Sequence, residues 1–137
     1  MTESFLDKYL MKNPEDTKDR RQGELLEDDH GAFGYLRGIH ERAVMLQLRM
    51  REGQIAAFPY AYLSEVYFNP SDEIKLRFGR MRVTIIGRNL NLDLRPNVRL
   101  FEGIARHRIS WLREEEGEMH SGPQTQETVI ESIKVEE

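Results

Sequence analysis

The sequence predicts a mainly β fold with flanking helices: a small, strongly bent barrel of five strands, followed by a C-terminal helix and a short strand. Three observations predict it. Apolar and polar residues alternate with a period of two between about residues 44 and 94, turn-forming residues separate these runs, and charge is distributed unevenly along the chain. A chain of 137 residues, 39% hydrophobic and 32% charged, suits one domain with solvated extensions.

The charge divides the chain into three parts. Residues 1–32 carry a net charge of -4, residues 33–113 carry +7 and residues 114–137 carry -7. Thirteen of the fourteen basic residues in the central part are arginine, whose planar fork suits phosphate and carboxylate partners. We therefore expect an arginine-rich domain over residues 33–113, between a flexible acidic N-terminal segment (1–32) and a flexible acidic C-terminal tail (114–137).

Helices are expected before the strands. Phe5, Leu6, Tyr9 and Leu10 have helical spacing, which fits a short amphipathic helix that ends before Asn13-Pro14. A second short helix is predicted over residues 36–43, weakened by Gly38.

Alternation predicts strands over residues 44–50, 74–78, 81–85 and 90–94. Residues 54–58 are predicted as the return strand of a hairpin, and 63–68 as a further extended run. Glu52-Gly53 has the composition of a hairpin turn, in which glycine supplies the positive φ. Pro59 predicts a bend or an edge position, because proline cannot donate to a β ladder. The turn residues at 69–72 separate the predicted strand 63–68 from the predicted strand 74–78.

The chain after residue 97 is predicted to form a helix over residues 98–107 and a short strand over 109–112, anchored by Trp111. The stretch 129–135 is β-branched and flanked by acids. A frayed tail is the favoured interpretation of it, and a partner-binding peptide is the alternative.

Cations occupy alternate positions on the predicted strands, so they should point outward while the apolar residues face the core. The functional hypothesis is a site for nucleic acid or another polyanion, and the alternative is a solvated face that keeps strand edges from pairing with other chains. The candidate polyanion-binding residues are Arg49, Arg51, Lys75, Arg77, Arg80, Arg82 and Arg88.

An apolar strand that ends in Gly87-Arg88-Asn89 and is followed by Leu90 resembles the second motif of the Sm/LSm family of small β-barrels. The order of predicted elements over residues 36–94 is similar to that family as well. The resemblance implies a barrel and a ring-forming homo-oligomer, and Gly87, Arg88 and Asn89 are its matching positions. The sequence departs from the family at Ile86, where an arginine usually precedes the glycine, and it lacks the Asp-x-x-x-Asn pattern of the first motif.

Signals of catalysis and metal binding are not found in the sequence. The chain has no cysteine, which excludes disulfides, thiol nucleophiles and thiolate metal sites. The four histidines are scattered, and there is no glycine-rich phosphate loop or nucleophile elbow. We therefore expect no enzyme activity, no cofactor and no metal. No apolar run reaches membrane-spanning length, and Met1-Thr2-Glu3-Ser4 does not begin a signal peptide, so we expect a cytoplasmic protein without membrane contact.

Three functional hypotheses follow from these patterns. The first is a non-enzymatic small-barrel module that binds RNA or another polyanion through its arginine-rich sheet face. The alternative is a protein–protein interaction or self-assembly module without a nucleic-acid role. The third, which depends on the first, is that the acidic tails cover the basic face as an internal polyanion mimic.

Overall fold

The computed structural model describes residues 26–93, 98–116 and 127–137, and these residues are mainly β. The helix expected over residues 1–12 lies outside them. The described elements, in chain order, are β1 (Glu27–Asp29), β2 (Phe33–Leu36), β3 (Met45–Arg49), β4 (Ile55–Pro59), the 3₁₀ turn η2 (Tyr60–Tyr62), β5 (Leu63–Asn69), β6 (Glu73–Phe78), β7 (Met81–Arg88), α3 (Leu100–Ala105), β8 (Ile109–Arg113) and β9 (Val129–Glu136).

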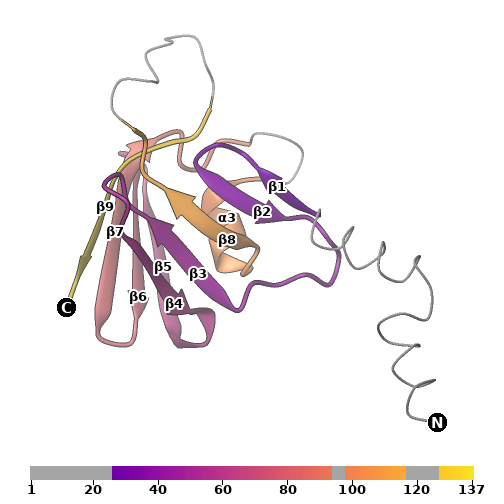
Figure 1. The fold of residues 1–137 in the computed structure, drawn as a ribbon, viewed down its shortest axis with the longest axis horizontal. Coiled ribbons are helices and arrows are strands. Elements are labelled where there is room, and N and C mark those ends of the chain that lie inside the picture. Colours follow the sequence, from indigo (N-terminus) through magenta and orange to yellow (C-terminus); the bar gives the residue numbers. More distant parts are fainter. Residues whose placement is uncertain (1–25, 94–97, 117–126) are drawn as a thin grey trace.

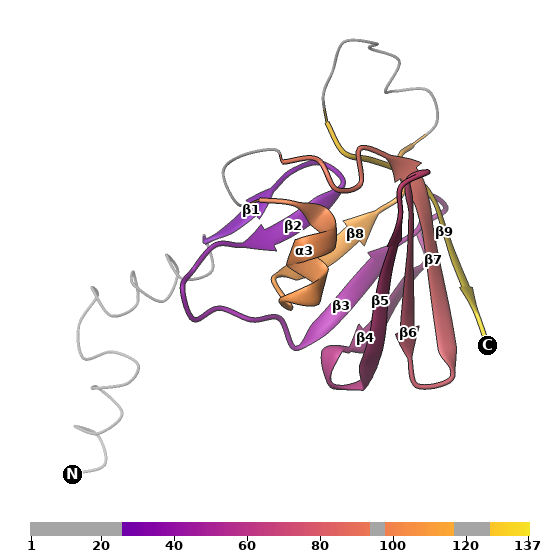
Figure 2. The same cartoon turned by 180° about the vertical axis from the view of Figure 1, so that it is seen from behind.

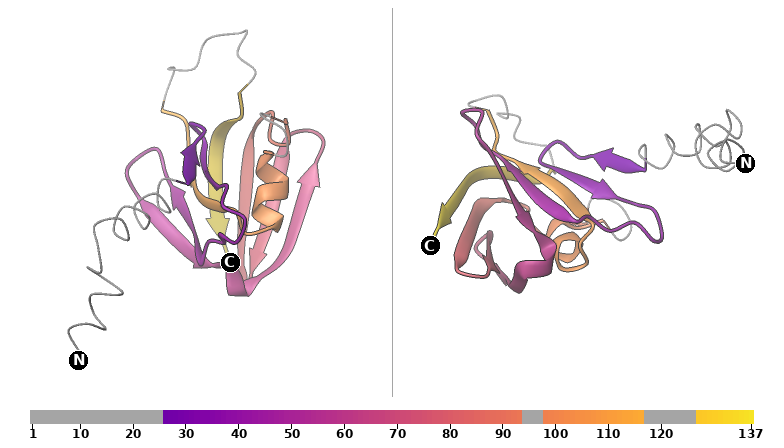
Figure 3. Two further views of the ribbon diagram at one scale, coloured as in Figure 1. Left: turned by 90° about the vertical axis from the view of Figure 1, so that its right-hand side faces the viewer. Right: turned by 60° about the horizontal axis from the view of Figure 1, so that its bottom comes forward.

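The strands form two sheets (Figures 1 and 2). The first sheet has the order β1-β2-β8-β3-β4, with β3 and β8 parallel and every other pair antiparallel. The second sheet has the order β5-β6-β7-β9 and is antiparallel throughout. The chain passes from the first sheet to the second at η2, directly after Pro59, which confirms the predicted bend. The second sheet curls against the first, as Figure 3 shows, and α3 packs beside β8 and β5.

Alternation explains which side of each strand faces the core. Leu46 and Leu48 of β3 are fully buried, and the same holds for alternate residues of β6 and β7. Burying a side chain of this size contributes about 1.5–3 kcal/mol. Aromatic contacts link the layers: the rings of Phe58 and Phe78 stack with centroids 5.2 Å apart. The turns behave as the sequence predicts, because Gly53 has a φ of 99° between β3 and β4.

The mainly β class is therefore confirmed, but the closed five-stranded barrel is wrong for the described residues, which form two separate sheets. Alternation shows which residues face a core, but it does not show whether the first and last strands of a set pair with each other. The C-terminal helix predicted over residues 98–107 is not shown; within that range the structure has only the six residues of α3.

Two predicted elements are not formed. Residues 36–43 do not form a helix, because β2 extends to Leu36 and an irregular segment follows it. Residues 90–93 do not form a strand, because Asn89 has a φ of 56° and turns the chain after β7. Leu90 is then fully buried as part of the core and not as one member of an alternating strand.

The acidic segments also contain structure that the sequence analysis did not predict. Residues 27–29 form β1, which pairs with β2. Residues 129–136 form β9 and not a frayed tail, because Val129, Ile130 and Ile133 are buried against the core. None of the described helices has the length and the apolar composition that a membrane crossing needs.

Candidate functional site

The outer face of the second sheet carries cations in register. One row across the strands reads Glu65, Arg77, Arg82 and Glu136, and the next reads Tyr67, Lys75, Thr84 and Lys134. The neighbours of these residues along β6 and β7 are buried, so the rows point to solvent. We use the term cationic face for the outward basic residues of this sheet and its β6–β7 turn: Lys75, Arg77, Arg80, Arg82 and Lys134.

A hollow of about 480 Å³ lies on the cationic face. Its lining includes the cations Lys75, Arg77 and Arg82, and also Tyr67 and two carboxylates, Glu65 and Glu136. Tyr67 is 50% exposed. The sequence thus predicted three cations that the structure brings into one hollow, and Arg80 stands beside them in the turn at Gly79.

Carboxylates border the cationic face on both sides. Arg77 Nε lies 3.7 Å from Glu65 Oε1 on β5, and Arg80 Nη1 lies 4.0 Å from Glu137 Oε2 after β9. Arg77 and Arg82 are direct cross-strand neighbours, and like charges in that position repel each other. The bordering acids reduce that repulsion. Ion pairs this exposed contribute little to stability, with a typical value of about 0.2–1 kcal/mol.

Arg49 lies on β3 of the first sheet and Arg51 in the turn that follows it, so neither belongs to the cationic face. The guanidinium carbon of Arg49 sits 4.5 Å from the ring centroid of Trp111, and that of Arg113 sits 4.9 Å from it. Trp111 in turn covers Gly34, where a Cβ would lie 2.3 Å from the indole nitrogen. The first of the predicted cations therefore packs on an aromatic ring.

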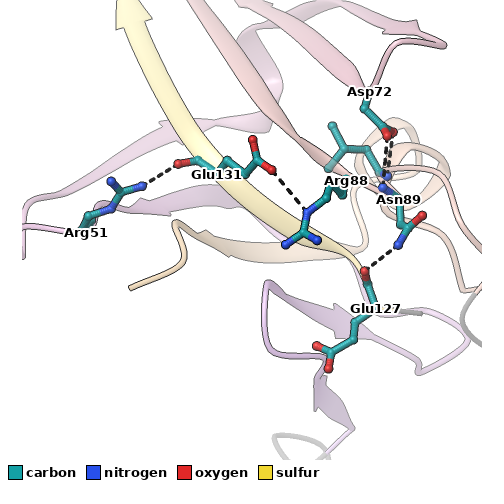
Figure 4. Close-up of polar contacts among 7 residues, drawn as sticks. Arg51, Asp72, Arg88, Asn89, Glu127 and Glu131 are labelled. Carbon is teal, nitrogen blue, oxygen red and sulfur yellow. Dashed lines mark hydrogen bonds and ion pairs between the residues drawn. The ribbon is translucent and has the colours of Figure 1, made fainter. Parts of the chain in front are cut away.

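Arg51 joins the two sheets. Its Nη2 donates to the main-chain oxygen of Glu131 at 2.6 Å (Figure 4). Its Nε donates to the main-chain oxygen of Glu115 at 3.1 Å. The carboxylate of Glu114 accepts from the backbone amides of Arg51 and Ile133, both at 2.7 Å. We call Arg51 and Glu114 the clamp. The clamp holds the middle of β9 on the side away from β7.

The three positions that match the Sm-like motif also contact the segment around β9 (Figure 4). A Cβ on Gly87 would lie 2.0 Å from the carbonyl oxygen of Val129, so only glycine lets β9 approach this closely. Arg88 Nε lies 3.3 Å from Glu131 Oε2, and Asn89 Nδ2 donates to the main-chain oxygen of Glu127 at 2.9 Å.

Asp72 fixes the turn at the end of β7. It accepts hydrogen bonds from the backbone amides of Asn89 and Leu90 at 3.3 and 3.2 Å (Figure 4). The buried Thr128 hydroxyl donates to the Asn89 carbonyl at 2.8 Å. These bonds join the β5–β6 turn, the end of β7 and the start of β9.

Sequence reasoning missed Lys134, Glu114 and the bordering acids of the C-terminal segment. A usable signal was present: Ile133 and Val135 alternate with Lys134 and Glu136. The acidity of the surrounding segment led to the frayed-tail interpretation instead.

The titratable residues of the interior have structural roles. Tyr60 is buried and its hydroxyl donates to the Ile109 carbonyl at 2.7 Å. Burial raises the pKa of Tyr60 well above its ordinary value. His107 stacks on the Tyr60 ring at 4.4 Å. Among the described residues, no three His, Asp or Glu side chains are grouped so that they could hold a metal ion.

Comparison of the chain with protein-family models, with curated proteins and with solved structures finds no match.

Proposed function

We propose that this protein is a non-enzymatic binding module that takes an anionic polymer, nucleic acid foremost, on the cationic face of its second sheet. One observation carries the proposal: Lys75, Arg77 and Arg82 line the same hollow as the half-exposed Tyr67. Cations beside an exposed aromatic ring suit a phosphate backbone that carries stackable bases.

Each residue type has a part in this binding mode. The guanidinium groups of Arg77 and Arg82 offer forked donors to phosphate oxygens, and Lys75 adds a compact charge. The Tyr67 ring offers a surface for one base. Contacts of this kind are independent of nucleotide sequence, so the proposal is affinity for a class of polymer and not for one sequence.

The acids on either side favour a single strand over a duplex. Glu65 on β5 and Glu136 on β9 flank the two central strands, β6 and β7. Neighbouring strands lie about 4.8 Å apart, so the cations on β6 and β7 form a narrow strip. A single phosphate backbone fits along such a strip, whereas the second backbone of a duplex would approach the flanking carboxylates.

The test is binding of a labelled single-stranded oligonucleotide to the full chain, followed by fluorescence anisotropy at several salt concentrations. The logarithm of the association constant should fall with the logarithm of salt by about 0.7 per neutralised phosphate. Lys75→Glu and Arg82→Glu should each weaken binding and reduce that slope, since each removes a phosphate contact.

Arg106→Glu is the matched control, because Arg106 is exposed and lies after α3, away from the cationic face, and the substitution changes the net charge equally. It should leave affinity nearly unchanged. Absence of binding at low salt, or an equal loss in the control variant, would refute the proposal.

A second candidate function is protein–protein interaction or self-assembly through the first sheet. β4 is an edge strand of that sheet, and near it Val44, Met45 and Ile55 are 79%, 41% and 62% exposed. Uncharged edge strands with exposed apolar residues favour pairing with another chain. A symmetric homo-oligomer is one form of this proposal.

Light scattering at increasing protein concentration tests this second candidate. Assembly through β4 should give a species larger than the monomer, and Ile55→Lys should return it to the monomer, because a lysine on an edge opposes strand pairing. A wild-type protein that stays monomeric at high concentration would count against it.

A further inference from the structure

We infer that the acidic residues at the end of β9 act as an internal competitor for the cationic face, so that a ligand must displace them. This inference rests on the proposed function and concerns the regulation of the same site. We use the term acidic cover for Glu136 and Glu137.

The acidic cover contacts two of the five residues of the cationic face. Glu136 is the direct cross-strand neighbour of Arg82 in the β7–β9 ladder. A main-chain oxygen of Glu137 accepts from Arg82 Nη2 at 3.3 Å, and the Glu137 carboxylate lies 4.0 Å from Arg80. A carboxylate is chemically similar to the phosphate oxygens of the proposed ligand in charge and in accepting hydrogen bonds from arginine. The Glu137 carboxylate and a ligand phosphate therefore compete for Arg80, and the main-chain oxygen of Glu137 occupies a donor of Arg82.

The two ends of β9 are held very differently. The first half is fixed by buried Val129, Ile130 and Ile133 and by the clamp residue Glu114. The last residues are exposed, and the outer end of β9 lies at the edge of the sheet (Figure 1). The acidic cover can therefore leave the arginines while the rest of β9 stays in the core.

The strength of the contacts fits a cover that a ligand can displace. The side chains of Arg80 and Glu137 are 88% and 70% exposed, and solvent screens an ion pair in that position. The expected effect is thus a lower affinity for anions, and not a closed site.

A purely structural role makes a different prediction. If Glu136 and Glu137 serve only to reduce repulsion around Arg77 and Arg82, then neutralising them lowers stability and leaves anion affinity changed only by the net charge. Competition instead raises affinity specifically when the acids at this face are removed.

The experiment compares two full-length double variants. Glu136→Gln/Glu137→Gln removes the charge of the acidic cover and keeps the side-chain size. Glu52→Gln/Glu102→Gln changes the net charge equally at two exposed positions, in the β3–β4 turn and on α3. The probe is a fluorescein-labelled oligothymidylate at low salt, and urea denaturation verifies that both variants fold.

We expect the cover variant to bind the probe about two- to fivefold more tightly than the wild type, with little change in the control. The difference in affinity between the cover variant and the wild type should vanish at high salt, where screening weakens the contacts of both the acidic cover and the probe. An equal rise in both variants, or no rise in the cover variant while the wild type binds, overturns this inference and leaves the proposed function intact. If wild type and both variants all fail to bind, the proposed function itself fails.

Discussion

Replacing Gly87 with alanine should push β9 away from β7 and destabilise the protein. The added Cβ would lie 2.0 Å from the Val129 carbonyl oxygen and 3.1 Å from the Ile130 Cα, whereas ordinary contacts begin at 3.4 Å. The Val129 carbonyl must therefore retreat by about 1.4 Å, the difference between 3.4 and 2.0 Å, or the backbone of β7 must move by the same amount.

The loss of unfolding free energy in Gly87→Ala lies between two limits set by the structure. Overpacking that is relieved by small shifts costs about 1–3 kcal/mol. If β9 instead leaves the sheet, Val129, Ile130 and Ile133 lose burial worth about 1.5–3 kcal/mol each, which approaches the whole stability of a small domain. We expect a loss of at least about 2 kcal/mol, measured by urea denaturation with far-UV circular dichroism.

Gly79 supplies the control for this prediction. It has a φ of 64° and nothing within 4 Å of its Cβ position, so alanine there meets only a conformational cost of about 1–2 kcal/mol. Asparagine tolerates this backbone region better than alanine, so Gly79→Asn should be milder than Gly79→Ala. At Gly87 the order should reverse, so that Gly87→Asn destabilises more than Gly87→Ala, because the obstacle there is the size of the side chain. A Gly87→Ala variant as stable as the wild type would refute the reasoning.

Three further substitutions test other contacts. Ile133→Ala should cost about 2–4 kcal/mol in urea denaturation because it opens a cavity in the core, and a loss under about 1 kcal/mol would show that β9 adds little to stability. Burial raises the pKa of Tyr60, so its contribution to stability is complete below pH about 10, where unfolded tyrosine ionises, and declines above that pH. Tyr60→Phe should therefore flatten the fall in unfolding free energy between pH about 9 and 11. Parallel curves for the variant and the wild type would contradict this. Glu114→Ala should cost about 1–3 kcal/mol, since the amides of Arg51 and Ile133 lose their acceptor, and Glu114→Gln should restore part of that in thermal denaturation.

The strands that could be predicted are those whose alternation is local. β3, β4, β5, β6 and β7 follow one another with short turns, so each reveals its buried face within a few residues. β9 is different, because its apolar residues are buried only when it pairs with β7, tens of residues earlier in the chain. Its acidic neighbours dominated the interpretation of the sequence, and no local pattern identified its partner.

The residues of the candidate site, like the strands, could be predicted only where the pattern is local. Lys75, Arg77 and Arg82 could be placed together from the sequence, because β6 and β7 are joined by a tight turn and pair in register. Arg49 and Arg51 were grouped with them only because they also alternate with apolar residues. The bend after Pro59 carries the chain to another sheet, and alternation holds no information about which sheet a strand joins.

The position of Trp111 provides an intrinsic fluorescence probe of the first sheet. It is the single tryptophan of the chain and only 6% exposed, and the guanidinium groups of Arg49 and Arg113 lie over its ring in the first sheet. Its fluorescence therefore reports the packing of the first sheet, while circular dichroism reports the strands of both. If the two signals change at different denaturant concentrations, the second sheet opens separately from the first, and the coupling that Arg51 provides between them becomes directly measurable.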